Sequence, residues 1–121
     1  MKFTRENTSS LLIRSVSGST IRIADEIYDR TIALTVNGAV EEWNGKAIGE
    51  LRQEDFEAIL DAKPEIIVLG TGERIEFAHR ELVFSMARAG VGLEVMDTKA
   101  AARTFNVLAA DGRRVAAVLY V

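Results

Sequence analysis

The stretch that decides the fold is Ile66-Ile67-Val68-Leu69-Gly70-Thr71-Gly72. Its four consecutive apolar residues, three of them β-branched, predict a strand buried on both faces of a sheet. The segment Gly70–Gly72 predicts a tight turn at the end of this strand, because glycine adopts positive φ angles without a steric penalty. The residues on either side of the strand should therefore form the rest of the sheet and the helices that cover it.

The second half of the chain alternates between helical and strand patterns. Phe56, Ile59 and Leu60 recur at helical spacing, and acidic residues stand in the first turn, where the helix dipole favours them. Lys63-Pro64 ends this helix, and Gly90 ends the next, because proline and glycine favour helix ends. The pattern predicts helices over 52–62, over 79–89 and from Asp97 or Thr98 to about Phe105, with strands over 93–96 and 115–121.

The first half of the chain is β-rich. Ile32, Leu34 and Val36 alternate with smaller residues, which predicts a half-buried strand over 30–36. Asn37-Gly38 is typical of a type I′ hairpin turn, with a return strand over 39–43. Shorter strands are predicted over 11–16, over 20–23 and at Ile27-Tyr28, so that the whole half resembles an antiparallel meander.

The predicted fold is α/β with α+β character, in one domain over 1–121. Its β-rich half covers 1–50 and its α/β half covers 51–121. The alternation of helix and strand in the second half is typical of crossover connections on a largely buried sheet.

Composition excludes several classes of site. The 121 residues include no cysteine and one histidine, which excludes disulfides, thiol catalysis, Cys-zinc sites and His-rich metal sites within one chain. The net charge of −3, with both signs mixed along the chain, argues against nucleic acid as a partner. No apolar run approaches the roughly 18 residues of a membrane span, and no secretory signal is visible. The sequence thus predicts a cytoplasmic protein with no transmembrane segment, no metal site and no cofactor.

The best place for a site is the carboxyl ends of the strands, where open α/β sheets bind ligands. If the strands over 66–69 and 93–96 are neighbours, the glycine turn and the helix start at Asp97-Thr98 meet at one edge. Glycine N–H groups and a helix N-terminus could approach an anion there. Arg103, one helical turn beyond Lys99, could add a positive rim. The ligand-binding candidates are Gly70, Thr71, Gly72, Asp97, Thr98 and Arg103.

Each candidate also has a structural explanation. Gly-Thr-Gly lacks the spacing of both phosphate-loop motifs, so it can equally be a simple exit turn. Asp97 and Thr98 are preferred helix caps, and Arg103 can belong to a solvated helix face.

No catalytic residue is predicted. His79 stands at a helix start without a recognisable partner, Ser85 lies within a helix, and Glu41-Glu42 are merely adjacent in sequence. The sequence leaves open whether the protein is an enzyme. Trp43 and Tyr28 suit packing, and a role in partner binding is the alternative for each.

Three blocks of sequence together resemble a known family. They are Pro64–Gly72, Gly90–Thr98 and Ala101–Leu108, in matching order and spacing. They resemble a widespread family of small domains of unknown function, whose mitochondrial members act as assembly factors for respiratory complex I (NADH:ubiquinone oxidoreductase). Phe105 stands where that family often has a tyrosine.

The resemblance implies a fold and a function. The implied fold has three layers: an antiparallel β layer with a helix, a central mixed sheet, and helices behind. The implied function is a non-catalytic binding or assembly module with a protein partner, linked to respiratory-complex biogenesis. The alternative is a small-ligand-binding protein or an enzyme that uses the edge at Gly70–Gly72 and Asp97-Thr98. The oligomeric state is not predicted.

Overall fold

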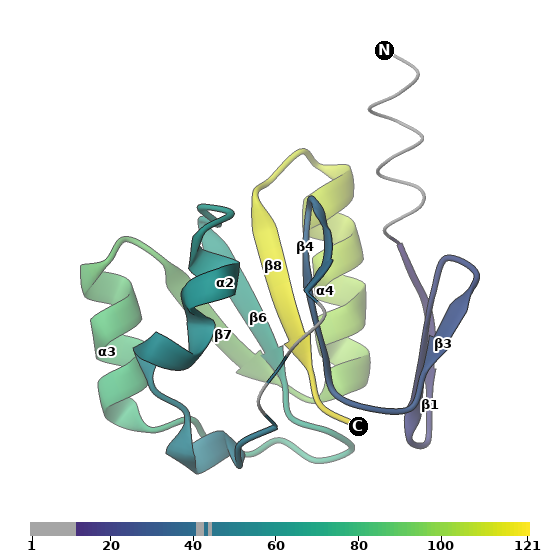
Figure 1. Cartoon of the computed structure of the whole chain (residues 1–121), viewed down its shortest axis with the longest axis horizontal. Coiled ribbons are helices and arrows are strands. Elements are labelled where there is room, and N and C mark those ends of the chain that lie inside the picture. The colour runs from purple at the N-terminus through teal and green to yellow at the C-terminus, as the bar shows by residue number, and fades with distance from the viewer. Residues whose placement is uncertain (1–11, 41–42, 44) are drawn as a thin grey trace.

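The computed structural model describes residues 12–40, 43 and 45–121, and it combines two sheets with several helices (Figure 1). The strands are β1 (Ile13–Ser17), β2 (Thr20–Ile23), β3 (Glu26–Tyr28), β4 (Ile32–Thr35), β5 (Gly38–Val40), β6 (Ile66–Gly70), β7 (Gly92–Met96) and β8 (Val115–Leu119). The helices are the 3₁₀ turns η1 (Ile48–Glu50) and η2 (Gln53–Phe56) and the α-helices α2 (Glu57–Leu60), α3 (Arg80–Arg88) and α4 (Thr98–Ala110).

The larger sheet has five strands in the order β5-β4-β8-β6-β7. β6 runs parallel to both β7 and β8, whereas β4 runs antiparallel to β8 and to β5. The sheet is therefore mixed, and the predicted combination of an antiparallel part with crossover α/β units is confirmed. Strands from both halves of the chain meet in it, because β8 lies between β4 and β6.

Alternate residues of the central strands face two separate core clusters. In β6, Val68 belongs to one cluster, while Ile67 and Leu69 belong to the other. The first cluster also contains residues of α4 and of the sheet β1-β2-β3, and the second contains residues of η1, η2, α2 and α3. Figure 1 shows α4 behind the sheet and α2 in front of it.

Two strand predictions need correction. β4 is not half-buried: both of its faces are buried, including Ala33 and Thr35. The reason is that β4 has a neighbouring strand on each side and a core cluster on each face. The predicted hairpin exists, but its loop is Val36-Asn37, since Thr35 pairs with Gly38. Gly38 has a φ of 131°, and the Asn37 N–H donates to Thr35 Oγ1. Leu11, Glu41 and Glu42, which belong to predicted strands, lie outside the described residues.

Two helix predictions also need correction. The segment predicted as one helix over 52–62 is split into η2 and the single turn α2, because Phe56 leaves helical geometry (φ −102°, ψ 13°) while its ring is fully buried. α4 continues to Ala110, five residues beyond the predicted end. Leu108, Ala109 and Ala110 are good helix formers, and Gly112 (φ 80°) follows the Asp111 cap.

Candidate functional site

The two predicted strand ends lie side by side. β6 and β7 are neighbours, and Gly70 pairs with Met96, so the glycine turn and the start of α4 meet at one edge of the sheet, as the sequence predicted. A Cβ atom on Gly70 would come within 2.8 Å of Thr98 Cα and 3.0 Å of Ala101 Cβ. Glycine is therefore required at position 70 because the first turn of α4 packs directly on the strand.

Hydrogen bonds within the protein use the polar groups of this edge. The Gly72 N–H donates to Thr98 Oγ1 (2.7 Å), and the Thr98 N–H donates back to the Gly72 carbonyl (2.9 Å). The Thr98 hydroxyl in turn donates to the Tyr120 carbonyl (2.6 Å), and the Tyr120 N–H donates to the Gly70 carbonyl (2.9 Å). This buried threonine thus ties the ends of β6, α4 and β8 together.

Thr71 and Asp97 are engaged in the same way. The Thr71 side chain is buried, donates to the Arg74 carbonyl (2.6 Å) and accepts from the Glu76 N–H (3.0 Å). Asp97 is the N-cap of α4 and accepts from the Ala100 N–H (2.8 Å). The Gly72 N–H and the Thr98 and Ala100 N–H groups at the start of α4, which an anion could use at this edge, already have partners. These bonds favour the structural explanation of the turn.

A cavity of about 280 Å³ nevertheless opens beside the edge. Three of the predicted residues line it, namely Gly72, Asp97 and Thr98; its other lining residues are Val16, Gly18, Glu73, Lys99, Tyr120 and Val121. Gly70 and Thr71, in the same turn, are buried and do not line the cavity. Arg103 is exposed and lines a different cavity, between α4 and β1. The structure thus brings together five of the six candidates and separates the sixth.

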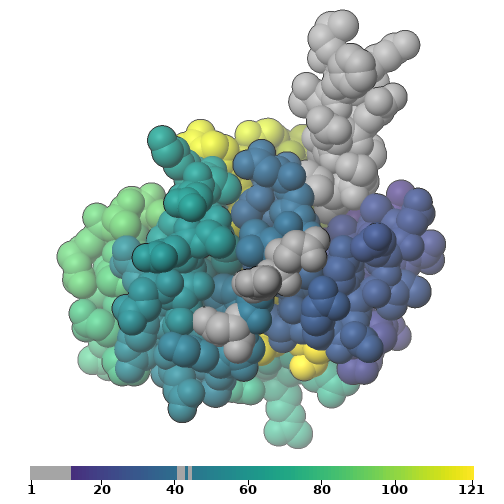
Figure 2. Space-filling view, viewed as in Figure 1, coloured from purple at the N-terminus to yellow at the C-terminus, as the bar shows by residue number. Residues whose placement is uncertain are grey.

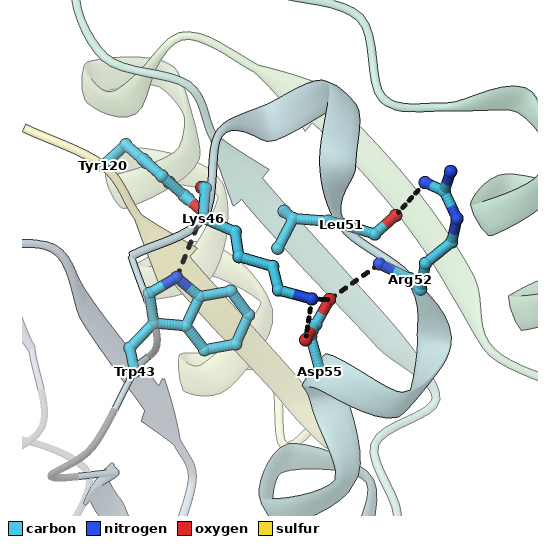
Figure 3. A network of polar contacts seen from close by, with 6 residues as sticks. All are labelled: Trp43, Lys46, Leu51, Arg52, Asp55 and Tyr120. Carbon is cyan, nitrogen blue, oxygen red and sulfur yellow. Dashed lines mark hydrogen bonds and ion pairs between the residues drawn. The ribbon is translucent and has the colours of Figure 1, made fainter.

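A polar network involving Trp43 lies at the end of β8. The Trp43 indole N–H donates to the Tyr120 hydroxyl (3.1 Å), which donates to the Lys46 carbonyl. The Lys46 ammonium lies 3.0 Å from Asp55, whose side chain is only 8% exposed and also accepts from the Arg52 N–H (2.9 Å). Figure 3 shows the indole directed at Tyr120 and the ammonium directed at Asp55.

These contacts explain Trp43 as a packing residue. Its ring meets Phe56 edge-on, with centroids 5.2 Å apart, and its N–H is satisfied by Tyr120. Burial raises the pKa of Tyr120 above its ordinary value of 10.0; the Trp43 hydrogen bond opposes this shift and the nearby Asp55 charge adds to it. No sequence pattern marks Tyr120, because a tyrosine at the end of a strand is unremarkable.

His79 and Tyr28 also have structural roles. His79 is the N-cap of α3, and its Nδ1 accepts from the Glu81 N–H (3.1 Å). The Tyr28 hydroxyl donates to Glu26 (3.0 Å), and the Arg30 guanidinium lies 5.6 Å from the Tyr28 ring centroid.

Three large apolar side chains are exposed on the segment that follows β6. Phe77 is 83% exposed, Ile75 is 54% exposed and Phe84, on α3, is 50% exposed. Ile75 and Phe77, which stand beside the charged residues Arg74 and Glu76, were not identified from the sequence. Their alternation with charged residues was the signal that could have revealed them.

The described part of the chain contains neither a helix that could cross a membrane nor a cluster of potential metal ligands. None of its helices has the length and apolar character needed to cross a bilayer. Within the same residues, no group of three or more His, Cys, Asp or Glu side chains is placed to hold a metal ion.

Comparison with known proteins supplies relatives of known name. The chain is 34% identical over 82 residues to NADH dehydrogenase (ubiquinone) 1 alpha subcomplex assembly factor 3 of Rattus norvegicus, and the match covers 66% of this chain and 44% of that protein. The chain thus spans less than half the length of this relative. It is 31% identical over 72 residues to the 13 kDa major membrane protein of Francisella tularensis, covering 60% of this chain and 58% of the relative.

Solved structures share the fold. A Xanthomonas campestris protein determined by NMR superposes with a TM-score of 0.82 at 37% identity, covering 90% of this chain and 83% of its own. A family model described as "Protein of unknown function (DUF498/DUF598)" matches residues 13–120, a range that includes every strand and helix from β1 to β8. The chain therefore belongs to the DUF498/DUF598 family.

Proposed function

We propose that this protein is a non-catalytic binding or assembly module that contributes to the biogenesis of a respiratory complex. The relatives named as assembly factors support the assembly role. The three-layer stack implied by the family resemblance would act as a rigid scaffold. The cysteine-free sequence fits a reducing compartment, and the cytoplasm is the compartment we propose.

The observation that carries the proposal is the exposure of Ile75, Phe77 and Phe84. We call these three residues the apolar surface. Aromatic side chains that are exposed in a free protein and buried in a complex dominate binding energies at interfaces. Figure 2 shows the teal-green loop after β6 projecting from the lower edge of the molecule, where a partner can reach it. Protein binding through this loop and α3 accounts for three apolar side chains that contribute little to the core.

A pull-down from the native host tests the assembly role. We expect the wild-type protein to recover a subunit or precursor of a respiratory complex, and we expect Phe77→Ala with Phe84→Ala to lose it. Val107→Ala is the matched control, because Val107 is 65% exposed on α4, outside the apolar surface. Failure of the wild-type protein to recover any respiratory subunit, or equal recovery by the double variant, would contradict the proposal.

The second candidate function is small-ligand binding or catalysis at the strand-end edge. The cavity of about 280 Å³ beside Gly72, Asp97 and Thr98 favours it, with Lys99 and Glu73 as charged lining residues. A thermal-shift screen with phosphates, nucleotides and carboxylates tests it, because a ligand at about 100 times its Kd stabilises the native state by about 2.7 kcal/mol. If no compound raises the unfolding temperature, this candidate is rejected.

A further inference from the structure

A second cavity lies between α4 and β1, and positively charged side chains line it. Its volume is about 330 Å³, and Arg14, Lys99 and Arg103 line it together with apolar residues that include Ile13 and Ala102. No aspartate or glutamate is among the described residues that line it. Arg14 and Arg103 do not line the strand-end cavity, whereas Lys99 lines both.

The fold builds this cavity from two walls. On β1 the pairing with β2 shifts between Ile13 and Ser15, which places Arg14 at a β-bulge, and bulges commonly re-aim a side chain near a functional site. On α4, Lys99 and Arg103 are four residues apart and so lie on one face of the helix.

Asn106 fixes the spacing between the two walls. Its side-chain oxygen accepts from the Ile13 N–H and its side-chain nitrogen donates to the Ile13 carbonyl, both at 2.9 Å. A paired hydrogen bond of this kind holds the bulge against α4, so the cavity is a built feature of the fold.

The charge balance of this cavity differs from that of the rest of the molecule. The whole sequence has 18 acidic and 15 basic residues, and the ion pairs found among the described residues lie elsewhere, at Lys46–Asp55, Arg88–Glu81 and Arg113–Glu65. Like charges one helical turn apart repel each other, and none of the described residues that line the cavity carries a carboxylate to relieve that repulsion. An anion bound between the three cations would do so.

We propose that this cavity binds the phosphate group of a phosphorylated ligand. A guanidinium presents a planar fork of donors that matches phosphate oxygens, and an ammonium adds a compact charge. Two guanidinium groups and one ammonium therefore suit a phosphate better than a single carboxylate, and the apolar walls accommodate the group that carries the phosphate. The source is either a soluble phosphorylated molecule or a phospholipid headgroup, and it does not depend on the assembly role.

Two binding experiments test this proposal on the full chain. The first is isothermal titration with inorganic pyrophosphate, and the second is co-sedimentation with phosphatidylcholine vesicles with and without phosphatidylglycerol. The test variant is Arg14→Gln with Arg103→Gln. The control is Arg80→Gln with Arg22→Gln, which removes the same charge at two exposed positions outside the cavity. Circular dichroism verifies that both variants are folded.

We expect binding in at least one arm, and we expect the control to bind nearly as well as the wild type. Binding should be weakened about tenfold or more in the test variant, because the loss of even one of its two charge-assisted contacts is worth about a factor of ten. Binding of pyrophosphate identifies a soluble ligand, and binding confined to the phosphatidylglycerol vesicles identifies a headgroup. Absence of binding in both arms, or equal weakening in test and control variants, would overturn the proposal. Because Arg14 and Arg103 lie outside both the strand-end cavity and the apolar surface, neither result depends on the proposed function.

Discussion

The substitution Gly70→Ala tests the packing of α4 on β6. Gly70 lies at the end of β6, and its backbone is not in the left-handed region, so the effect of a methyl group is steric. The new Cβ would lie 2.8 Å from Thr98 Cα, 2.9 Å from Thr98 Oγ1 and 3.0 Å from Ala101 Cβ. Two of these atoms belong to the helix frame and cannot rotate away, so α4 must move.

The expected magnitude follows from that displacement. Overpacking of this kind costs about 1–3 kcal/mol. A shift of α4 also stretches the hydrogen bonds between Thr98 and Gly72, each worth about 1 kcal/mol. The lower entropy of the unfolded alanine chain offsets about 0.4–1 kcal/mol. We therefore expect the free energy of unfolding to fall by about 2 kcal/mol.

Equilibrium denaturation in urea, followed by circular dichroism, measures this change. Gly49→Ala is the matched control, because a Cβ at Gly49 would meet no heavy atom within 4 Å and its φ is not positive. We expect the control to be neutral or slightly stabilising. If Gly70→Ala is as stable as Gly49→Ala, the close approach of α4 to β6 does not exist in solution and the reasoning fails.

Three further predictions concern the same end of the sheet. Thr98→Val should lower the free energy of unfolding, measured by urea denaturation, by about 2–4 kcal/mol, because it leaves the Gly72 N–H and the Tyr120 carbonyl without their partner. Thr98→Ser keeps the hydroxyl and should lose less stability. Equal losses in the two variants would show that the methyl group matters instead. Asp97→Ala should cost about 1 kcal/mol by removing the cap on the Ala100 N–H, whereas Asp97→Asn, itself a capping residue, should cost little; a similar loss in both would point to the charge. The pKa of Tyr120 is raised in the folded state, so the unfolded state releases this proton first, and the free energy of unfolding should fall as the pH rises above about 10. Tyr120→Phe should show a smaller fall between pH 9 and 11. A pH profile identical to that of the wild type would refute this assignment.

The sequence predicted the strand-end edge well because local rules decide it. A continuous apolar run gave β6, Asp97 gave the cap of α4, and the glycine turn marked where the two meet. The neighbour relation of β6 and β7 followed from the general behaviour of crossover units. Whether this edge binds a ligand stays a prediction, since its donors are engaged within the protein.

Other features depend on contacts between distant segments, and local patterns do not show them. The alternation of large and small residues in β4 predicted a half-buried strand. In the structure β4 pairs with β8, more than eighty residues further along, in a sheet with a core cluster on each face. The sequence predicted Arg103 beside the glycine turn, but in the structure it lines the cavity between α4 and β1. Arg14 lines the same cavity from a bulge that no sequence pattern marked. Phe77 is likewise exposed because no other described segment packs over its side chain, and a local pattern cannot show this.

The position of β8 also bears on how the chain folds as it is synthesised. β4 and β6 each pair with β8, so until β8 has left the ribosome the sheet is two incomplete pieces with open edges. The β4–β5 hairpin and the β6–α3–β7 unit must wait for the last strand, and their exposed edges could pair with other chains in the meantime. Slow translation before residue 115 should therefore favour aggregation, and the completion of the sheet should be a late, cooperative step that the nascent chain takes only once Leu119 is available.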